Sequence, residues 1–315
     1  MSPASNAPNG LRWDISRLLK YAPADLIGRE AETQLLDAAW AKAQGGEPNR
    51  PRVLTFVALG GEGKTSLVAH WAATLAAQDW PGCAAAFAWS FYSQGTRDQS
   101  AASSDIFLKE ALTFFDDDAD KAFAASNVGA FEKGQRLARV VGERKNLLIL
   151  DGLEPLQYAP TSPTPGELRD QGIAALLKGL AQHNRGLCLV TTRRTLPDLN
   201  AFRQTTAPEV VLHRLSRAAG VCLLKTLGVR GTAQEFERLV EDVKGHALTL
   251  TLLGGFLHRA RLFHAATPYP WTSPQADLAA ARKLIEQCGY GRRKEELEDA
   301  EAAIPFGSPG DFALY

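Results

Sequence analysis

Residues 57–68 read VALGGEGKTSLV, which is close to the phosphate-loop pattern G-x-x-x-x-G-K-[ST], except that Ala58 replaces the first glycine. Residues 52–58 are apolar and rich in strand-forming side chains, so they predict a buried strand. Residues 65–77 carry helix formers. A glycine-rich turn between a buried strand and a helix start is the context in which such a loop binds phosphate, so the stretch predicts a nucleotide-binding site.

Seven consecutive residues form the expected phosphate cradle: Gly60, Gly61, Glu62, Gly63, Lys64, Thr65 and Ser66. The glycines allow backbone N–H groups to point at phosphate oxygens, and the helix start adds a positive dipole. Lys64 supplies a charge for the β and γ phosphates, Thr65 a hydroxyl for Mg²⁺, and Ser66 a further hydroxyl for phosphate. Ala58 lies nearest the strand, where a methyl group fits if the backbone dihedral angles are ordinary.

Two further segments place polar residues at the ends of apolar runs. In LLILDGLE, residues 147–154, Asp151 is the candidate Mg²⁺ ligand at the end of a neighbouring strand, and Glu154 is placed to polarise a water in line with the γ phosphate. In LVTTRR, residues 189–194, Arg193 is the candidate sensor of the γ phosphate. The plainer alternatives are a helix cap for Asp151, a surface acid for Glu154 and a loop charge for Arg193.

The order of elements predicts the fold class. Apolar, strand-like runs alternate with helix-like segments at residues 52–58, 84–92, 146–151, 187–192 and 210–212. They predict an α/β fold of the P-loop NTPase kind, a parallel sheet with helices on both faces, followed by a small all-α helical subdomain. The expected division is a disordered or linker segment at 1–25, a nucleotide-binding domain at 26–213, a helical subdomain at 214–265 and a partial helical extension at 266–315.

Composition narrows the partners. The chain has 35 Lys plus Arg and 35 Asp plus Glu among its 315 residues, so no global field attracts nucleic acid or anionic lipid, and a nucleic-acid partner is not expected. The 4 cysteines include no C-x-x-C pair, which indicates neither a zinc site nor a disulfide framework. The N-terminal residues lack the pattern of a secretory signal, and the longest apolar run, residues 247–257, is too short to cross a bilayer. We expect a cytoplasmic protein with no membrane partner.

Taken together, residues 26–257 resemble the signal-transduction ATPases with numerous domains (STAND), the group that contains the NB-ARC and NACHT modules. Residues 26–30, LIGRE, resemble the family's lead-in, whose backbone holds the adenine. The resemblance assigns that contact to Ile27, Gly28 and Arg29. No N-K-x-D or T-K-x-D segment selects guanine, so ATP and ADP are the expected nucleotides.

Later segments extend the resemblance. Residues 151–154, DGLE, resemble the NACHT Walker B pattern, and residues 191–193, TTR, resemble the family's sensor strand. Residues 245–255, GHALTLTLLGG, resemble the G-x-P-L-A-L motif of the helical subdomain, with Ala247 in place of the proline that packs on the nucleotide. His246 is a candidate nucleotide contact, and the alternative is a helix-start residue facing solvent.

The resemblance implies an ATP-hydrolysing conformational switch, in which ADP holds the two domains closed and ATP exposes a surface for homo-oligomerisation. It also implies signalling in bacterial defence, with a trigger ligand and an effector domain that the sequence does not identify. One alternative is a nucleotide-dependent assembly scaffold with little or no turnover. A second is a DNA-associated ATPase or a transcription-factor module, which the neutral net charge disfavours. Neither an effector domain before residue 26 nor a winged-helix domain at the C-terminal end is recognisable. We therefore expect a piece of a larger receptor, and the alternative is a reduced standalone module.

Overall fold

The structure, a computed structural model, describes residues 5–6, 11–91, 104–115, 123 and 125–263. The chain forms two compact units, and residues 59–63 belong to the second although they lie within the first in sequence. The first unit contains residues up to 58 together with 64–212, and the second contains residues 59–63 and those from 213 onward.

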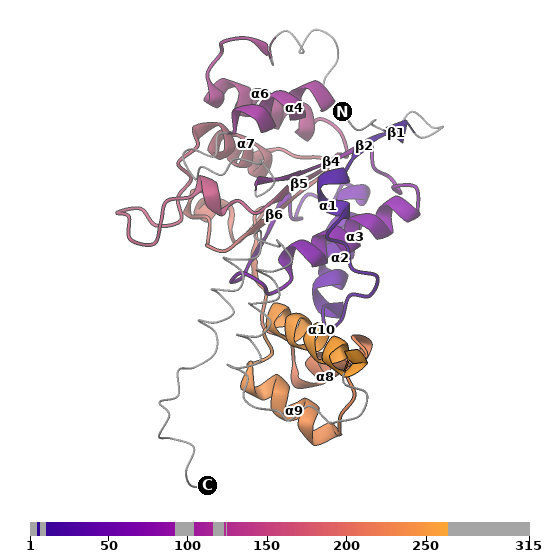
Figure 1. Ribbon diagram of the computed structural model, residues 1–315. Helices are drawn as coiled ribbons and strands as arrows, with labels where there is room; N and C mark the ends of the chain where they lie inside the picture. The colour runs from indigo at the N-terminus through magenta and orange to yellow at the C-terminus, as the bar shows by residue number, and fades with distance from the viewer. Residues whose placement is uncertain (1–4, 7–10, 92–103, 116–122, 124, 264–315) are drawn as a thin grey trace. The chain divides into compact units, whose positions relative to one another are not determined.

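A seven-stranded sheet forms the centre of the first unit, in the order β1-β2-β4-β5-β6-β3-β7 (Figure 1). The strands are β1 (Ser5–Asn6), β2 (Arg12–Asp14), β3 (Val53–Val57), β4 (Ala85–Ser90), β5 (Leu147–Asp151), β6 (Leu187–Thr192) and β7 (Glu209–Val211). β1 runs antiparallel to β2, whereas the other neighbouring strands are parallel. Parallel strands need crossover connections, and in this unit helices supply most of them.

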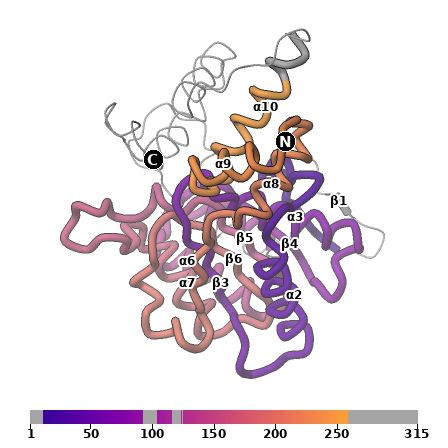
Figure 2. The backbone as a smooth tube through the Cα atoms, turned by 90° about the horizontal axis from the view of Figure 1, so that it is seen from below, coloured from indigo at the N-terminus to yellow at the C-terminus, as the bar shows by residue number. Residues whose placement is uncertain are grey.

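Helices cover both faces of the sheet, so successive side chains of each central strand enter different cores. In β5, Leu148 and Leu150 belong to one core, and Leu147 and Ile149 belong to the other. The helices are α4 (Asp105–Phe115), α6 (Ala130–Gly142) and α7 (Gln171–Gln182) on the first face, and α1 (Ser16–Leu19), α2 (Glu30–Gly45) and α3 (Lys64–Ala77) on the second (Figure 1). Figure 2 shows α6 and α7 on one side of the strands and α2 and α3 on the other. The predicted fold class is confirmed.

The described part of the second unit is helical apart from its loops. It contains α8 (Arg217–Thr226), α9 (Ala233–Asp242) and α10 (Ala247–Phe263). The Ser216 side chain accepts a hydrogen bond from the Ala219 N–H at the start of α8, and Thr232 and Glu235 form a capping box on α9. Each helix buries a leucine: Leu224 on α8, Leu239 on α9 and Leu250 on α10.

Residues 11–25 differ from the expectation of a disordered or linker segment at 1–25, whereas residues 1–4 and 7–10 lie outside the described part of the chain. β2 pairs in parallel with β4, and Ile15 and Leu18 beside it are 0% and 1% exposed. A strand of 3 residues is too short to produce a periodic signal, so only its tertiary partner reveals it. The expected extension at 266–315 lies outside the described residues. No described helix has both the length and the apolar character needed to cross a membrane.

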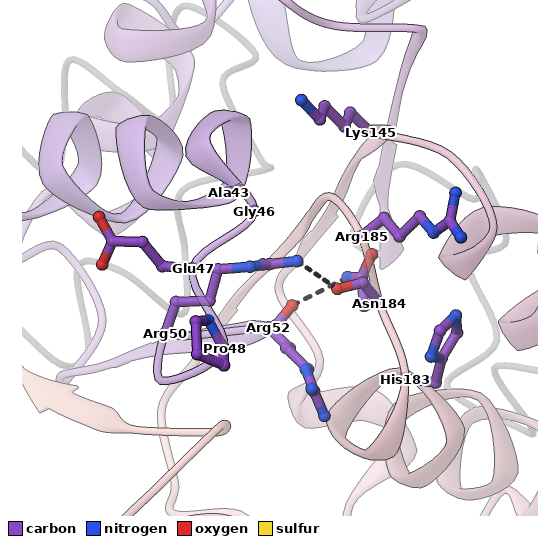
Figure 3. Close-up of a pocket in the computed structure, with 10 residues that line it drawn as sticks. All are labelled: Ala43, Gly46, Glu47, Pro48, Arg50, Arg52, Lys145, His183, Asn184 and Arg185. Atoms are coloured by element: carbon purple, nitrogen blue, oxygen red, sulfur yellow. Dashed lines mark hydrogen bonds between the residues drawn. The ribbon is translucent and has the colours of Figure 1, made fainter.

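A cluster of cations lies before the amino ends of β3, β5 and β6 (Figure 3). Arg50 is 6% exposed, and its guanidinium donates to the carbonyls of Asn184 and Gly186 at 2.5 and 2.8 Å. Burial, and then the charge of Arg52, lower the pKa of Arg50. Arg52 donates to the last carbonyls of α7, and Lys145 donates to a carbonyl at the end of α2. Arg52 and Lys145 therefore satisfy carbonyls at helix C-termini, and Arg50 satisfies two carbonyls of the α7–β6 connection, around a cavity of about 260 Å³.

We expect Arg50→Met to lower the free energy of unfolding by about 2–3 kcal/mol, because it leaves two buried carbonyls without a charged donor. Urea denaturation followed by circular dichroism measures this change. The matched control is Arg139→Met on the exposed face of α6, for which the expected change is within about 0.5 kcal/mol. Equal stability of the two variants would show that Arg50 does not tie β3 to the α7–β6 connection.

Candidate functional site

The structure explains how Ala58 is accommodated in the glycine position of the loop pattern. The described non-glycine residues with positive φ are Asp79, Trp80 and Lys244, so Ala58 has an ordinary backbone conformation that does not require glycine. Its methyl group lies in the core, where Ala58 is 7% exposed, and its N–H donates to the carbonyl of Thr192 at 3.2 Å. Alanine at this position therefore needs no unusual backbone conformation.

Lys64 begins α3 directly after the loop. Its Nζ donates to the carbonyl of Ala58 at 2.7 Å, and the residue is 8% exposed. The backbone of Lys64 thus lies in the first turn of α3, and its ammonium group is held at the carboxyl end of β3. Ser66, two residues further, is partly buried in the same turn.

Asp151, at the carboxyl end of β5, accepts three side-chain hydrogen bonds. Thr65 Oγ1 and Thr191 Oγ1 donate to its Oδ1 at 2.7 and 2.8 Å, and Ser90 Oγ donates to its Oδ2 at 3.2 Å. Burial raises the pKa of Asp151, while these hydrogen bonds and the charge of Lys64 act in the opposite direction. The Asp151 carboxylate is 1% exposed and is held by three hydroxyls within a buried polar cluster.

The strand that carries Asp151 is not the neighbour of β3, contrary to the expectation from the sequence. β6 lies between β3 and β5, and it supplies Thr191, whose hydroxyl also accepts from the N–H of Gly152 at 2.9 Å. Sequence reasoning missed Ser90 and Thr191 as partners of the acid. The signal available in the sequence was a hydroxyl side chain at the end of an apolar run. In the structure, Ser90 is paired in register with Asp151.

The Thr65 and Asp151 oxygens fit a magnesium ion. Thr65 Oγ1 and Asp151 Oδ1 lie 2.7 Å apart, and adjacent ligands in an Mg²⁺ octahedron with bonds of 2.0–2.1 Å lie about 2.9 Å apart. Hydroxyl and carboxylate oxygens are also the ligand types that this ion prefers. Among the described residues no group of three or more His, Cys, Asp or Glu could hold a metal, so an ion here would need phosphate oxygens or water as its other ligands.

Glu154 and Arg193 follow the carboxyl ends of β5 and β6 and face each other. Glu154 begins the short 3₁₀ helix η2 (Glu154–Leu156), and its Oε1 lies 3.7 Å from Arg193 Nε. The hydroxyl of Thr192 donates to Oε1 of Gln157 at 2.5 Å. The two charged residues that the sequence singles out are therefore partners, whereas the threonine before the arginine is occupied by Gln157.

The lead-in residues lie just before α2. Arg29 is 4% exposed and lies 3.7 Å from Glu32 in an ion pair. The N–H of Gly28 donates to Glu30 Oε1 at 3.2 Å, and Ile27 is partly buried. A backbone contact of these residues with adenine remains a prediction.

Loop residues Gly60 and Gly61 contact the start of α10 within the second unit. His246 Nε2 lies 2.9 Å from the carbonyl oxygen of Gly60, and the N–H of Leu248 donates to the carbonyl of Gly61 at 3.0 Å. His246 is 1% exposed, so the alternative of a solvent-facing helix start is wrong. Its predicted contact with a nucleotide stays a prediction.

The structure of this chain is similar to several solved structures. The Walker-type ATPase of Pyrococcus abyssi matches with a TM-score of 0.50 and 15% identity, over 87% of this chain and 78% of that one. The ORC1 protein of Aeropyrum pernix, solved in complex with DNA, matches with a TM-score of 0.52 and 18% identity, over 86% and 69%. A STAND protein with a tetratricopeptide repeat sensor from Pyrococcus horikoshii has a TM-score of 0.47 and 17% identity, and the chain covers 33% of its length. No family model and no curated protein matches the sequence.

These likenesses define the fold. Six parallel strands flanked by helices, followed by a helical subdomain, form a P-loop NTPase-like fold that this chain shares with the two structures of TM-score 0.50 and 0.52. At 15–18% identity the matches carry the fold alone.

Proposed function

We propose that this chain binds ATP and ADP, hydrolyses ATP slowly in the presence of Mg²⁺, and changes conformation with the bound nucleotide. The observation that carries the proposal is the 2.7 Å hydrogen bond between Thr65 Oγ1 and Asp151 Oδ1. It joins the residue after the loop lysine to a buried acid on a strand that is distant in sequence. That pairing is the one that a nucleotide-bound Mg²⁺ requires of the protein.

Each candidate residue has a role in this proposal. The amides of residues 60–63, the ammonium of Lys64 and the hydroxyl of Ser66 bind the phosphates. Thr65 and Asp151 would hold Mg²⁺, which neutralises charge on the β and γ phosphates. The two remaining charges, Glu154 and Arg193, are assigned to the attacking water and to the γ phosphate, and the lead-in residues Ile27, Gly28 and Arg29 to adenine.

The finer part of the proposal is a STAND-type switch. It is supported by the resemblance of the lead-in, the loop and the G-H-A-L segment at residues 245–248 to that family, and by a helical unit after the sheet. ATP would favour a form that assembles into homo-oligomers for signalling in bacterial defence. Gel filtration of the protein with ATP and with ADP tests this part, and an identical elution volume in both would contradict it.

Lys64→Ala tests the binding site itself. The substitution removes the charge that faces the phosphates, so we expect the affinity for both ADP and ATP to fall at least tenfold, about 1.4 kcal/mol or more. Titration calorimetry measures both affinities. Lys109→Ala, on the exposed face of α4, is the matched control and should bind as the wild type does. Unchanged affinity in Lys64→Ala would remove the phosphate-loop assignment.

A further inference from the structure

Within the second unit, loop residues Gly60 and Gly61 are hydrogen-bonded to the start of α10 through their carbonyls. The Gly60 carbonyl lies 2.9 Å from His246 Nε2, and the Gly61 carbonyl accepts from the N–H of Leu248 at 3.0 Å. Because the first N–H groups of a helix have no acceptor within the helix, the Gly61 carbonyl satisfies one such group at the start of α10. The loop therefore acts as a cap for α10.

The orientation of the His246 ring determines which nitrogen carries the hydrogen. The backbone N–H of Thr249 points to Nδ1 at 3.3 Å, and a backbone N–H can only donate, so Nδ1 is an acceptor. The hydroxyl of Thr249, 2.7 Å from the same nitrogen, can also donate to it. The ring hydrogen is therefore on Nε2, which donates to the Gly60 carbonyl.

The packing at Gly61 leaves no room for a side chain. Its φ of +75° suits glycine, and a Cβ at this position would lie 2.7 Å from His246 Cε1 and 2.8 Å from Leu248 Cβ. The neighbouring acid, Glu62, is 3% exposed, with Oε1 at 3.4 Å from Arg214 Nε and 3.9 Å from His246 Nε2. The carboxylate is thus directed to basic groups of its own unit.

Peptide geometry links these carbonyl bonds to the loop amides. In a planar trans peptide the C=O and the following N–H point in opposite directions. Holding the carbonyls of Gly60 and Gly61 toward α10 therefore turns the N–H groups of Gly61 and Glu62 away from it. These are two of the amides that the proposed function assigns to phosphate.

We propose that His246 is a positioning residue of the phosphate loop, and that the start of α10 regulates nucleotide affinity through it. This inference rests on the proposed function, because it assigns the oriented amides to phosphate binding. The coupling is reciprocal: bound nucleotide stabilises the start of α10, and loosening that helix start weakens nucleotide binding. An event that displaces the start of α10 would therefore change the nucleotide affinity of the phosphate loop without contacting the nucleotide.

The test compares two substitutions at one position. Phenylalanine removes the donor, whereas the side-chain amide of glutamine reaches the place of Nε2. We expect His246→Phe to weaken ADP binding by about threefold to tenfold, the effect of one lost hydrogen bond, and His246→Gln to remain within about twofold of the wild type. The matched control is His258→Phe, since His258 also lies on α10 with Nδ1 at 3.2 Å from a glycine carbonyl, that of Gly228.

A second readout needs no nucleotide. In the free protein, amide hydrogen exchange of Leu248 should be faster in His246→Phe than in the wild type and in His246→Gln, because the loop no longer holds its acceptor. If His246→Phe does not fold, Thr249→Val takes its place, and we expect a smaller shift in the same direction. ADP affinity or Leu248 exchange equal to the wild type in the variant tested would overturn the inference. A wild-type protein that does not bind ADP would instead overturn the proposed function.

Discussion

Glu154→Gln is expected to lower the rate of ATP hydrolysis by about 10²–10³-fold, because it removes the carboxylate to which the proposed function assigns the attacking water. Glutamine keeps the size of the side chain, so the position at the start of η2 is unchanged. The substitution also removes the negative partner of Arg193, which lies 3.7 Å away. ATP affinity should therefore be retained or increased, and single-turnover phosphate release measures the chemical step separately from binding.

The control and the alternative outcomes separate an enzyme from a scaffold. Glu143→Gln, an exposed acid after α6, should hydrolyse ATP at the wild-type rate. If neither the wild type nor Glu154→Gln releases phosphate although both bind ATP, the chain is the nucleotide-dependent scaffold. Hydrolysis at the wild-type rate in Glu154→Gln would assign the water to another residue.

The central strands could be predicted because burial on both faces makes them continuous apolar runs. Residues 147–151 and 187–192 stand out for that reason. The order of the strands could not be predicted in the same way, because the strand order depends on which crossovers pack together and leaves no local periodicity. The insertion of β6 between β3 and β5 is therefore a finding of the structure.

The candidate site also contains residues that the sequence predicts and residues that only the structure identifies. A motif identifies residues that are close in sequence, such as Lys64 and Thr65, and an abrupt acid after an apolar run identifies Asp151. The hydroxyl partners of that acid, Ser90 and Thr191, come from two other strands, so only the register of the sheet brings them together. His246 is a similar case, because its partner lies 186 residues earlier in the chain.

Arg193→Ala is expected to weaken ATP binding by about tenfold to a hundredfold and to spare ADP, since a charge-assisted hydrogen bond to the γ phosphate contributes about 1.5–3 kcal/mol. Calorimetry with each nucleotide measures the two affinities. Arg194→Ala is the matched control, because Arg194 is the next residue in the chain and has no assigned role with phosphate. Its guanidinium donates to the carbonyl of Tyr158 at 3.1 Å.

The physical reason for the difference between the nucleotides lies in the ion pair with Glu154. With ADP, Arg193 keeps Glu154 as its partner, so removing the arginine changes little in the bound state. In the proposed function, the γ phosphate of ATP would compete for the guanidinium and release Glu154 for the water. A ligand shifts a two-state equilibrium only by its difference in affinity for the two states, so Arg193→Ala should also reduce any ATP-dependent assembly seen by light scattering. Equal losses of ATP and ADP affinity would mean that Arg193 supports the fold or the β phosphate instead.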